Sequence, residues 1–188
     1  MTCITPRAFA AETIALLKPL SCHAIAAASE GETPYWDATD WTSAAPRRVA
    51  VGAGAATGTT GAGDIQSVAS QYGVSPSLAA AIAWQESGFN NAMVSGANAR
   101  GVMQVMPGTW DYVQQNLAQR PLDPNSATDN VHAGVMYLKR LLDDSGGDES
   151  AAIAGYYQGL GALRSRGVFD DTAKYVANVQ ALRGRFGG

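Results

Sequence analysis

The chain has 188 residues, 46% of them apolar and 15% charged, which is enough for one globular domain with a tail. Its formal net charge of −3 provides no basic surface for a nucleic acid, so we expect no nucleic-acid partner. No apolar run is long enough to span a bilayer, so stable membrane insertion is not expected either.

Residues 1–63 are predicted to be a leader followed by a linker. An apolar stretch in residues 1–28 is interrupted by charged side chains, so this part resembles a degenerate or truncated secretion leader. Residues 44–63 consist mainly of Ala, Gly and Thr, which bury too little apolar surface to order a chain. We therefore expect a disordered or extended N-terminal tail. Cys3 and Cys22 lie in it and could form a disulfide or remain two thiols.

Two helices are predicted directly after this tail. Asp64 is a suitable N-cap for the first, which Gly73 would end. Ser75 can cap the second, with Pro76 at its first helical position, where a proline is favoured. Gly88 would end this helix, because glycine readily adopts the left-handed conformation that follows many helices.

Four further helices are predicted along the rest of the chain. The first covers Thr109–Leu117, and the next is capped by Asp129 and carries an apolar stripe. Asp148 can cap the following one, and Thr172–Phe186 would form the last. No sustained alternation of apolar and polar residues predicts a strand. The sequence thus predicts an all-α domain of about six helices over residues 64–188.

Glu86 is the candidate catalytic residue. It falls in the last turn of a predicted helix, where the helix dipole and nearby apolar side chains would both raise a carboxyl pKa, which suits a general acid near neutral pH. By spacing alone, a surface glutamate near a helix end is the more common case. The next segment, SGANARGVMQVMPGT, combines small residues with an amide and a proline, and such loops let backbone approach a ligand closely.

Several pieces of sequence follow this glutamate in a recognisable order. Glu86-Ser87 precedes Ser95, the GVMQVMP segment at residues 101–107, and Thr109. Farther on lie NVHAGVMYLKRLL, AIAGYYQGLGAL and DTAKYVANVQAL. Together these pieces resemble the catalytic domain of lytic transglycosylases of the soluble-lytic (SLT) type, within the lysozyme-like superfamily. The resemblance covers about Asp64 to Phe186, nearly the whole predicted domain.

The chain departs from the pattern of this family at three positions. Val102 replaces the usual leucine, and Asn98 stands where glycine is common, although asparagine also tolerates a left-handed backbone. Tyr157 replaces the frequent asparagine after Tyr156, which removes any polar contact of that asparagine. Asn130 is expected to brace a loop near the site.

The resemblance implies cleavage of the β-1,4 bond between N-acetylmuramic acid and N-acetylglucosamine in peptidoglycan, with a 1,6-anhydromuramoyl product. Glu86 would act first as an acid and then as a base. A second carboxylate, which ordinary glycoside hydrolysis uses, is unnecessary when the substrate supplies its own nucleophile. An acid distant in sequence could still lie nearby, and Asp111, Asp123 and Asp129 are candidates.

The resemblance also implies a set of substrate-binding residues. Ser95 and Gln104 would hydrogen-bond sugar or the catalytic carboxyl, and Met103 would line the groove floor. Tyr156 would orient that carboxyl or a bound N-acetyl group, and Gln158 would line the groove. Residue-based alternatives are a local turn cap for Ser95 and core packing for Met103 and Tyr156.

No His, Cys or carboxylate residues have the spacing of metal ligands, so we expect no metal and no cofactor. The predicted partner is the peptidoglycan glycan strand, bound by a monomer outside the cytoplasmic membrane, where this substrate lies. Two other functions stay open: a hydrolase like goose-type lysozyme, and a non-catalytic wall-binding domain. The same chemistry would also serve a phage or a secretion apparatus.

Overall fold

The computed structural model describes residues 60–188, so the predicted leader and nearly all of the predicted linker lie outside the described residues. This part of the chain forms seven α-helices and one 3₁₀-helix, without a strand, which confirms the all-α prediction. None of these helices is long and apolar enough to cross a membrane. The elements are α2 (Ala62–Gln71), α3 (Pro76–Ser87), α4 (Pro107–Asn116), α5 (Ala127–Asp144), α6 (Glu149–Gln158), α7 (Leu160–Arg166), α8 (Asp170–Arg183) and η3 (Gly184–Phe186).

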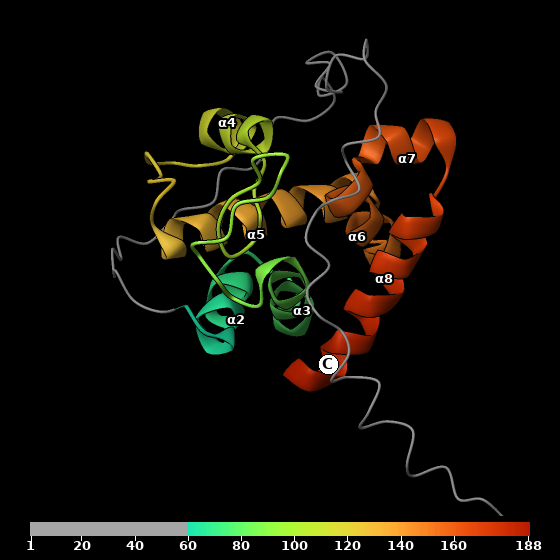
Figure 1. Ribbon diagram of the computed structural model, residues 1–188, viewed down its shortest axis with the longest axis horizontal. Coiled ribbons are helices and arrows are strands. Elements are labelled where there is room, and N and C mark those ends of the chain that lie inside the picture. The colour runs from blue at the N-terminus through green and yellow to red at the C-terminus, as the bar shows by residue number, and fades with distance from the viewer. Residues whose placement is uncertain (1–59) are drawn as a thin grey trace, which may run out of the picture.

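Helix α3 is a largely buried helix of the domain. It is placed between α2 and α8 and contacts both, while α5 runs across the domain and packs against α6 (Figure 1). Ten of its twelve residues are buried, because its alanine-rich sequence is apolar on nearly every side. Small side chains let neighbouring helices approach closely. The element that carries Glu86 is therefore enclosed by other helices.

Both predicted boundaries of α3 and the predicted start of α6 are confirmed. Ser75 caps α3, with Pro76 at its first position, and Gly88 ends it with a left-handed backbone at φ 63°. Asp148 caps α6 by accepting a hydrogen bond of 3.0 Å from the Ala151 amide. Helix α4 begins at Pro107 rather than at Thr109, because proline itself occupies the first helical position.

Two predicted N-caps are wrong, for the same reason. Gly61 caps α2, and Asp64 sits in the first turn, where its carboxylate accepts a hydrogen bond of 3.0 Å from the Gly61 amide. Ser126 caps α5 by accepting the Asp129 amide at 3.2 Å. Both acids thus lie three residues inside their helices, where the positive end of the dipole favours a negative charge.

The C-terminal part differs from prediction in two ways. The short helix α7 was not predicted, because its seven residues are too few to show a clear helical pattern. Glycines with positive φ, Gly159 and Gly167, flank it. The predicted helix Thr172–Phe186 is divided into α8, which begins two residues earlier at Asp170, and η3.

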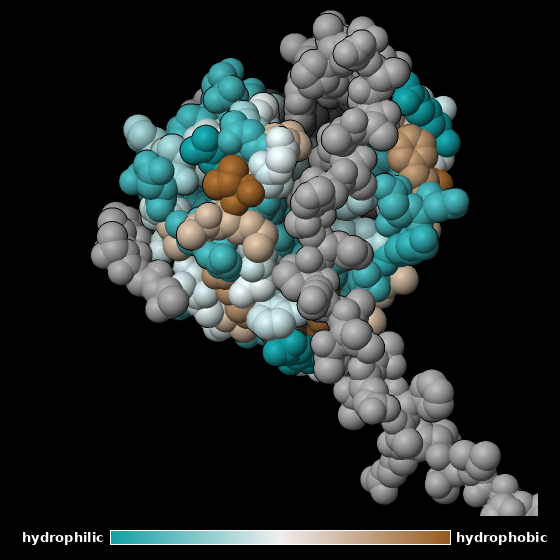
Figure 2. All heavy atoms as spheres, in the orientation of Figure 1, coloured by the Kyte–Doolittle hydropathy of each residue, from teal (hydrophilic) through white to brown (hydrophobic). Residues whose placement is uncertain are grey.

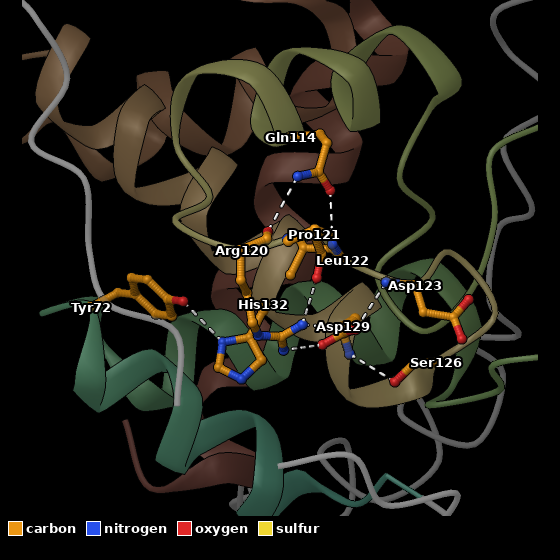
Figure 3. Close-up of polar contacts among 9 residues, drawn as sticks. All are labelled: Tyr72, Gln114, Arg120, Pro121, Leu122, Asp123, Ser126, Asp129 and His132. Carbon is orange, nitrogen blue, oxygen red and sulfur yellow. Dashed lines mark hydrogen bonds and ion pairs between the residues drawn. The ribbon is translucent and has the colours of Figure 1, made fainter. Parts of the chain in front are cut away.

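A buried polar network joins α2, α5 and the segment before α5 (Figure 3). The hydroxyl of Tyr72 lies 2.9 Å from Nδ1 of His132. Both Nη atoms of Arg120 donate to the carboxylate of Asp129, one of them at 3.2 Å, and the Asp123 amide donates to it at 2.9 Å. This carboxylate is therefore bound on both of its oxygens.

The electrostatics of the network favour one charge state for each group. Burial raises the pKa of Tyr72 to about 12, and burial together with the nearby Arg120 lowers the pKa of His132. Both shifts keep this pair neutral, so the phenol can donate to an unprotonated Nδ1. Burial opposes ionisation of Asp129, but hydrogen bonds from Arg120 and Asp123 outweigh it and hold its pKa below the ordinary value.

Candidate active site

Glu86 is buried at the end of α3. Only 4% of its surface is exposed, although it is an acidic residue in the last turn of a helix. The hydroxyl of Tyr175, on α8, donates a hydrogen bond of 2.5 Å to Oε1 of Glu86. Buried carboxyl groups need such partners, because burial without a hydrogen bond is costly. The contact joins residues 89 positions apart and fixes the direction of the carboxyl group.

Tyr175 is itself held by the end of α6. Its ring stacks on that of Tyr157, with centroids 4.6 Å apart and an interplanar angle of 24°. The hydroxyl of Tyr157 donates to Asp171, in the first turn of α8, at 3.4 Å. Tyr157 therefore supports the phenol that contacts Glu86.

The loop at residues 89–105 is fastened to the end of α3 by Ser87. The Oγ atom of Ser87 donates to the Val102 carbonyl at 2.7 Å and accepts the Asn90 amide at 3.0 Å. The loop holds every non-glycine residue with positive φ in the described part of the chain, namely Phe89, Asn98 and Gln104. Asn98 has a left-handed backbone at φ 64°, a conformation that asparagine tolerates. Such conformations are costly and persist only where the surroundings fix them.

Two of the predicted substrate-binding side chains hold this loop in shape. Gln104 is buried, and its amide nitrogen donates to the carbonyls of Met93 and Gly101 at 3.1 and 3.0 Å. The hydroxyl of Ser95 accepts the Ala99 amide at 3.0 Å, which is the turn contact expected from a serine in this position. Contacts of Ser95 and Gln104 with a sugar stay predictions.

Met103 connects the loop to α5 and α6. Its side chain is fully buried against Gly134, where an added Cβ would come within 2.6 Å of it. The Met103 amide donates to Oδ1 of Asn130 at 2.8 Å, and its carbonyl accepts the Tyr156 hydroxyl at 2.9 Å. Asn130 also donates to the Arg100 carbonyl at 2.9 Å, so its expected role as a brace for this loop is confirmed.

Gln158 has a different environment from the other predicted residues. Its Nε2 donates to the Gly167 carbonyl at 2.8 Å, and its Oε1 accepts the Phe169 amide at 3.1 Å. The structure thus joins Met103 and Tyr156 directly but places the amide of Gln158 on the connection between α7 and α8. The residue missing from the predicted set is Tyr175, although it lies in the terminal piece DTAKYVANVQAL of the resemblance.

None of the three acids considered as a second carboxylate is shown to contact Glu86. Asp129 is bound by Arg120, Asp123 accepts the Asn125 amide, and Asp111 is exposed on α4. Within residues 60–188 no group of three His, Cys, Asp or Glu side chains could hold a metal ion.

Two surface hollows lie away from Glu86. One of about 700 Å³ lies between α2, the start of α3 and the C-terminal residues, and one of about 390 Å³ lies beside Lys139 and Glu149. Glu86 lines neither, and the first is an open polar surface. The buried carboxyl group of Glu86 and its hydrogen bonds therefore identify the candidate active site better than the volume of either hollow does.

Comparison with known proteins places the described domain in a family. The Transglycosylase SLT domain profile matches residues 64–175, which include Glu86 and Tyr175. The protein named membrane-bound lytic murein transglycosylase C of Mannheimia succiniciproducens is 32% identical over 127 residues, covering 61% of this chain and 35% of that protein. The protein of the same name in Haemophilus influenzae strain Rd is 36% identical over 132 residues, covering 61% of this chain and 36% of that protein. The chain thus spans about a third of the length of these curated relatives.

Solved structures of lytic transglycosylases are also similar to this chain. An inactive glutamate-to-glutamine mutant of the lytic transglycosylase Slt from Pseudomonas aeruginosa is similar with a TM-score of 0.62 and 27% identity, over 66% of this chain and 23% of that one. The 70-kDa soluble lytic transglycosylase of Escherichia coli is similar with a TM-score of 0.60 and 26% identity, again over 66% of this chain and 23% of that one. The chain belongs to the Transglycosylase SLT domain family.

Proposed function

We propose that this chain is a peptidoglycan lytic transglycosylase, which cleaves the β-1,4 bond between N-acetylmuramic acid and N-acetylglucosamine. The observation that carries the proposal is the buried Glu86, held at the end of α3 by the hydroxyl of Tyr175. Membership of the family supports it, as do relatives that are named lytic murein transglycosylases.

In the first step Glu86 acts as a general acid. Its carboxyl proton passes to the glycosidic oxygen, the bond from C1 of the muramoyl residue to that oxygen breaks, and N-acetylglucosamine leaves with a free 4-hydroxyl. Positive charge develops at C1, and the N-acetyl group of the same sugar is the proposed source of its stabilisation. Tyr175 keeps Oε1 of Glu86 in place during this step.

In the second step the same carboxyl group acts as a base. The Glu86 carboxylate takes the proton from the C6 hydroxyl of the muramoyl residue, and that oxygen bonds to C1. The product is a 1,6-anhydromuramoyl end, water is not consumed, and Glu86 regains its proton. One carboxyl group is sufficient because the nucleophile is part of the substrate, which gives it a high effective concentration.

The remaining predicted residues would bind the glycan strand around this carboxyl group. Met103 and Tyr156 share a hydrogen bond at the loop after α3, and Ser95 and Gln104 shape that loop. Because Met103 is fully buried and its amide and carbonyl are bound by Asn130 and Tyr156, it would support the groove floor from beneath. We further propose that the chain works as a monomer outside the cytoplasmic membrane, where the glycan strands lie.

The test is product identification from purified peptidoglycan by mass spectrometry. The wild-type chain is expected to release muropeptides with anhydro ends, and Glu86→Gln is expected to reduce their rate of release by at least about a hundredfold, because the proton donor is lost. Asp111→Asn is the matched control, since it neutralises an exposed acid on α4.

Each other function predicts a different result. Reducing ends in place of anhydro ends would identify a hydrolase, and binding to peptidoglycan without any product would identify a non-catalytic domain. Full activity of Glu86→Gln would refute every mechanism that relies on this carboxyl group.

A further inference from the structure

The connection between α7 and α8 exposes two large apolar side chains. Val168 and Phe169 are 55% and 40% exposed, and with Val94, in the loop after α3, they are the exposed large apolar residues of the described part of the chain. In Figure 2 brown surface is visible over the loop after α3 and at the junction of α7 and α8. Exposure of an aromatic side chain to water is unfavourable, and a ligand that covers the ring removes its apolar surface from water.

This exposed segment has a fixed conformation. Gln158 binds it on both sides of Val168, because its amide nitrogen donates to the Gly167 carbonyl and its amide oxygen accepts the Phe169 amide. Phe169 is also the N-cap residue of α8, with an extended backbone at φ −78° and ψ 159°. Its backbone is therefore held by a side chain of α6 and by the start of a 14-residue helix.

The same two helices hold the tyrosine that contacts Glu86. Tyr157, next to Gln158 on α6, stacks on Tyr175 of α8, and Tyr175 donates to Glu86. Phe169 lies six residues before Tyr175, which places it about 9 Å farther along the α8 axis. A ligand that reached from Tyr175 to Phe169 would have to extend along α8 beyond the contact with Glu86.

We propose that Phe169 is a stacking platform for a sugar ring of the glycan strand, at a subsite away from the cleaved bond, and that Gln158 is the positioning residue that presents it. The inference rests on the proposed function, because it takes the glycan strand as the ligand. The flat apolar face of a phenyl ring matches the C–H face of a pyranose, and contact between them removes apolar surface from water. A residue whose backbone is already held loses less freedom on binding than one in a mobile loop.

Binding is measured with the Glu86→Gln variant, so that no bond is cleaved, and with peptide-free glycan strands as the ligand. Phe169→Ala in this background is expected to weaken binding about fivefold, whereas Phe169→Trp keeps a ring and is expected to bind as tightly as its parent. Val168→Ala, the matched control, removes a neighbouring apolar side chain that is not aromatic and is expected to leave the dissociation constant unchanged. Thermal unfolding of each variant verifies that it is folded.

The role of Gln158 is tested by a double-mutant cycle. Gln158→Ala is expected to weaken binding when Phe169 is present and to have no further effect in the Phe169→Ala background, because it acts through that ring. Additive losses would assign Gln158 a direct contact with sugar and would overturn its positioning role. Equal losses from Val168→Ala and Phe169→Ala, or no loss from Phe169→Ala, would overturn the stacking platform.

These results separate the two proposals. If the wild-type chain releases no anhydro products but strands still bind in a manner that depends on Phe169, the proposed function fails and the platform stands. If anhydro products appear and Phe169→Ala binds strands like its parent, the platform fails and the proposed function stands.

Discussion

The domain contains two buried carboxyl groups with opposite surroundings. Asp129 lies in the first turn of α5 and accepts hydrogen bonds from the Arg120 guanidinium and the Asp123 amide. Glu86 lies in the last turn of α3 and accepts the phenol of Tyr175. The start of a helix favours a negative charge and its end disfavours one.

This contrast separates a structural carboxylate from one that can exchange a proton. A guanidinium and a helix N-terminus hold Asp129 as a permanent anion, with its pKa below the ordinary value. Glu86 accepts a neutral hydroxyl and lies at a helix C-terminus, neither of which carries a fixed positive charge. Substitution at the first site should therefore affect stability, and substitution at the second should affect catalysis.

Replacement of Asp129 should have the largest effect on stability. Asp129→Ala is expected to lower the free energy of unfolding by about 3 kcal/mol, because it removes the partner of a largely buried cation. This loss of stability is at the lower end of the range for breaking a buried ion pair, because 28% of the Arg120 side chain is exposed and water can solvate it. Urea denaturation measures this change.

The catalytic readout makes the test of Asp129 specific. The rate per folded molecule should stay within about twofold of wild type, because Asp129 is not part of the Glu86 site. Asp111→Ala, an exposed acid on α4, is the matched control and should cost less than about 0.5 kcal/mol. A large loss of turnover in folded Asp129→Ala would contradict the separation of the two sites.

The second prediction concerns the phenol at Glu86. Tyr175→Phe removes one hydroxyl and keeps the ring that stacks on Tyr157, so the fold should lose only about 1 kcal/mol. The rate constant for release of anhydro products should fall about 10- to 100-fold, because the carboxyl group is no longer held in its direction. Tyr112→Phe, on α4, is the control and should not change this rate. Equal rates for Tyr175→Phe and wild type would show that the hydrogen bond has no catalytic part.

The sequence predicted those features whose causes are local. Helix α3 and the place of Glu86 in its last turn follow from Ser75, Pro76 and Gly88, all within or beside the helix. The Asp129 cap was predicted wrongly because Ser126, three residues earlier, is an equally suitable cap, and the carboxylate of Asp129 is used by Arg120 instead.

Features that depend on distant contacts were not predictable from local patterns. The hydrogen bond from Tyr175 to Glu86 joins residues 89 positions apart, and nothing in the spacing of either residue indicates it. Gln158 was predicted to line the groove from its position near Tyr156, but its amide is bound to a connection that only the fold brings close.

The third prediction uses pH to probe the network of Asp129. Burial and the nearby Arg120 lower the pKa of His132, so the unfolded chain takes up a proton near pH 6.5 that the native protein does not. The free energy of unfolding should therefore fall as the pH decreases from 7.5 to 5, by less than about 2 kcal/mol. Urea denaturation at several pH values measures this slope.

The sign and the pH range distinguish His132 from Asp129. Asp129 has a lowered pKa, so its contribution is fully present above its ordinary value of 3.8 and is lost only below it. The slope between pH 7.5 and 5 should therefore disappear in His132→Gln and persist in Asp129→Ala. A slope of equal size in His132→Gln would assign it to another group.

The smallest expected effect concerns a second guanidinium, near the helix of Glu86. Arg185, in η3, lies with its Cζ atom 4.1 Å from the ring centroid of Trp84, two residues before Glu86. Because Arg185 is exposed, the contact should contribute only about 0.5–1 kcal/mol, so Arg185→Ala should shift urea denaturation slightly and leave product release unchanged. Arg185→Lys keeps the charge and should lose part of this energy, since an ammonium covers less of the ring. If Arg185→Ala lowered the free energy of unfolding as much as Asp129→Ala, the arginine near Glu86 would contribute as much to stability as Arg120 does. The contrast between the Asp129 site and the Glu86 site would then not hold.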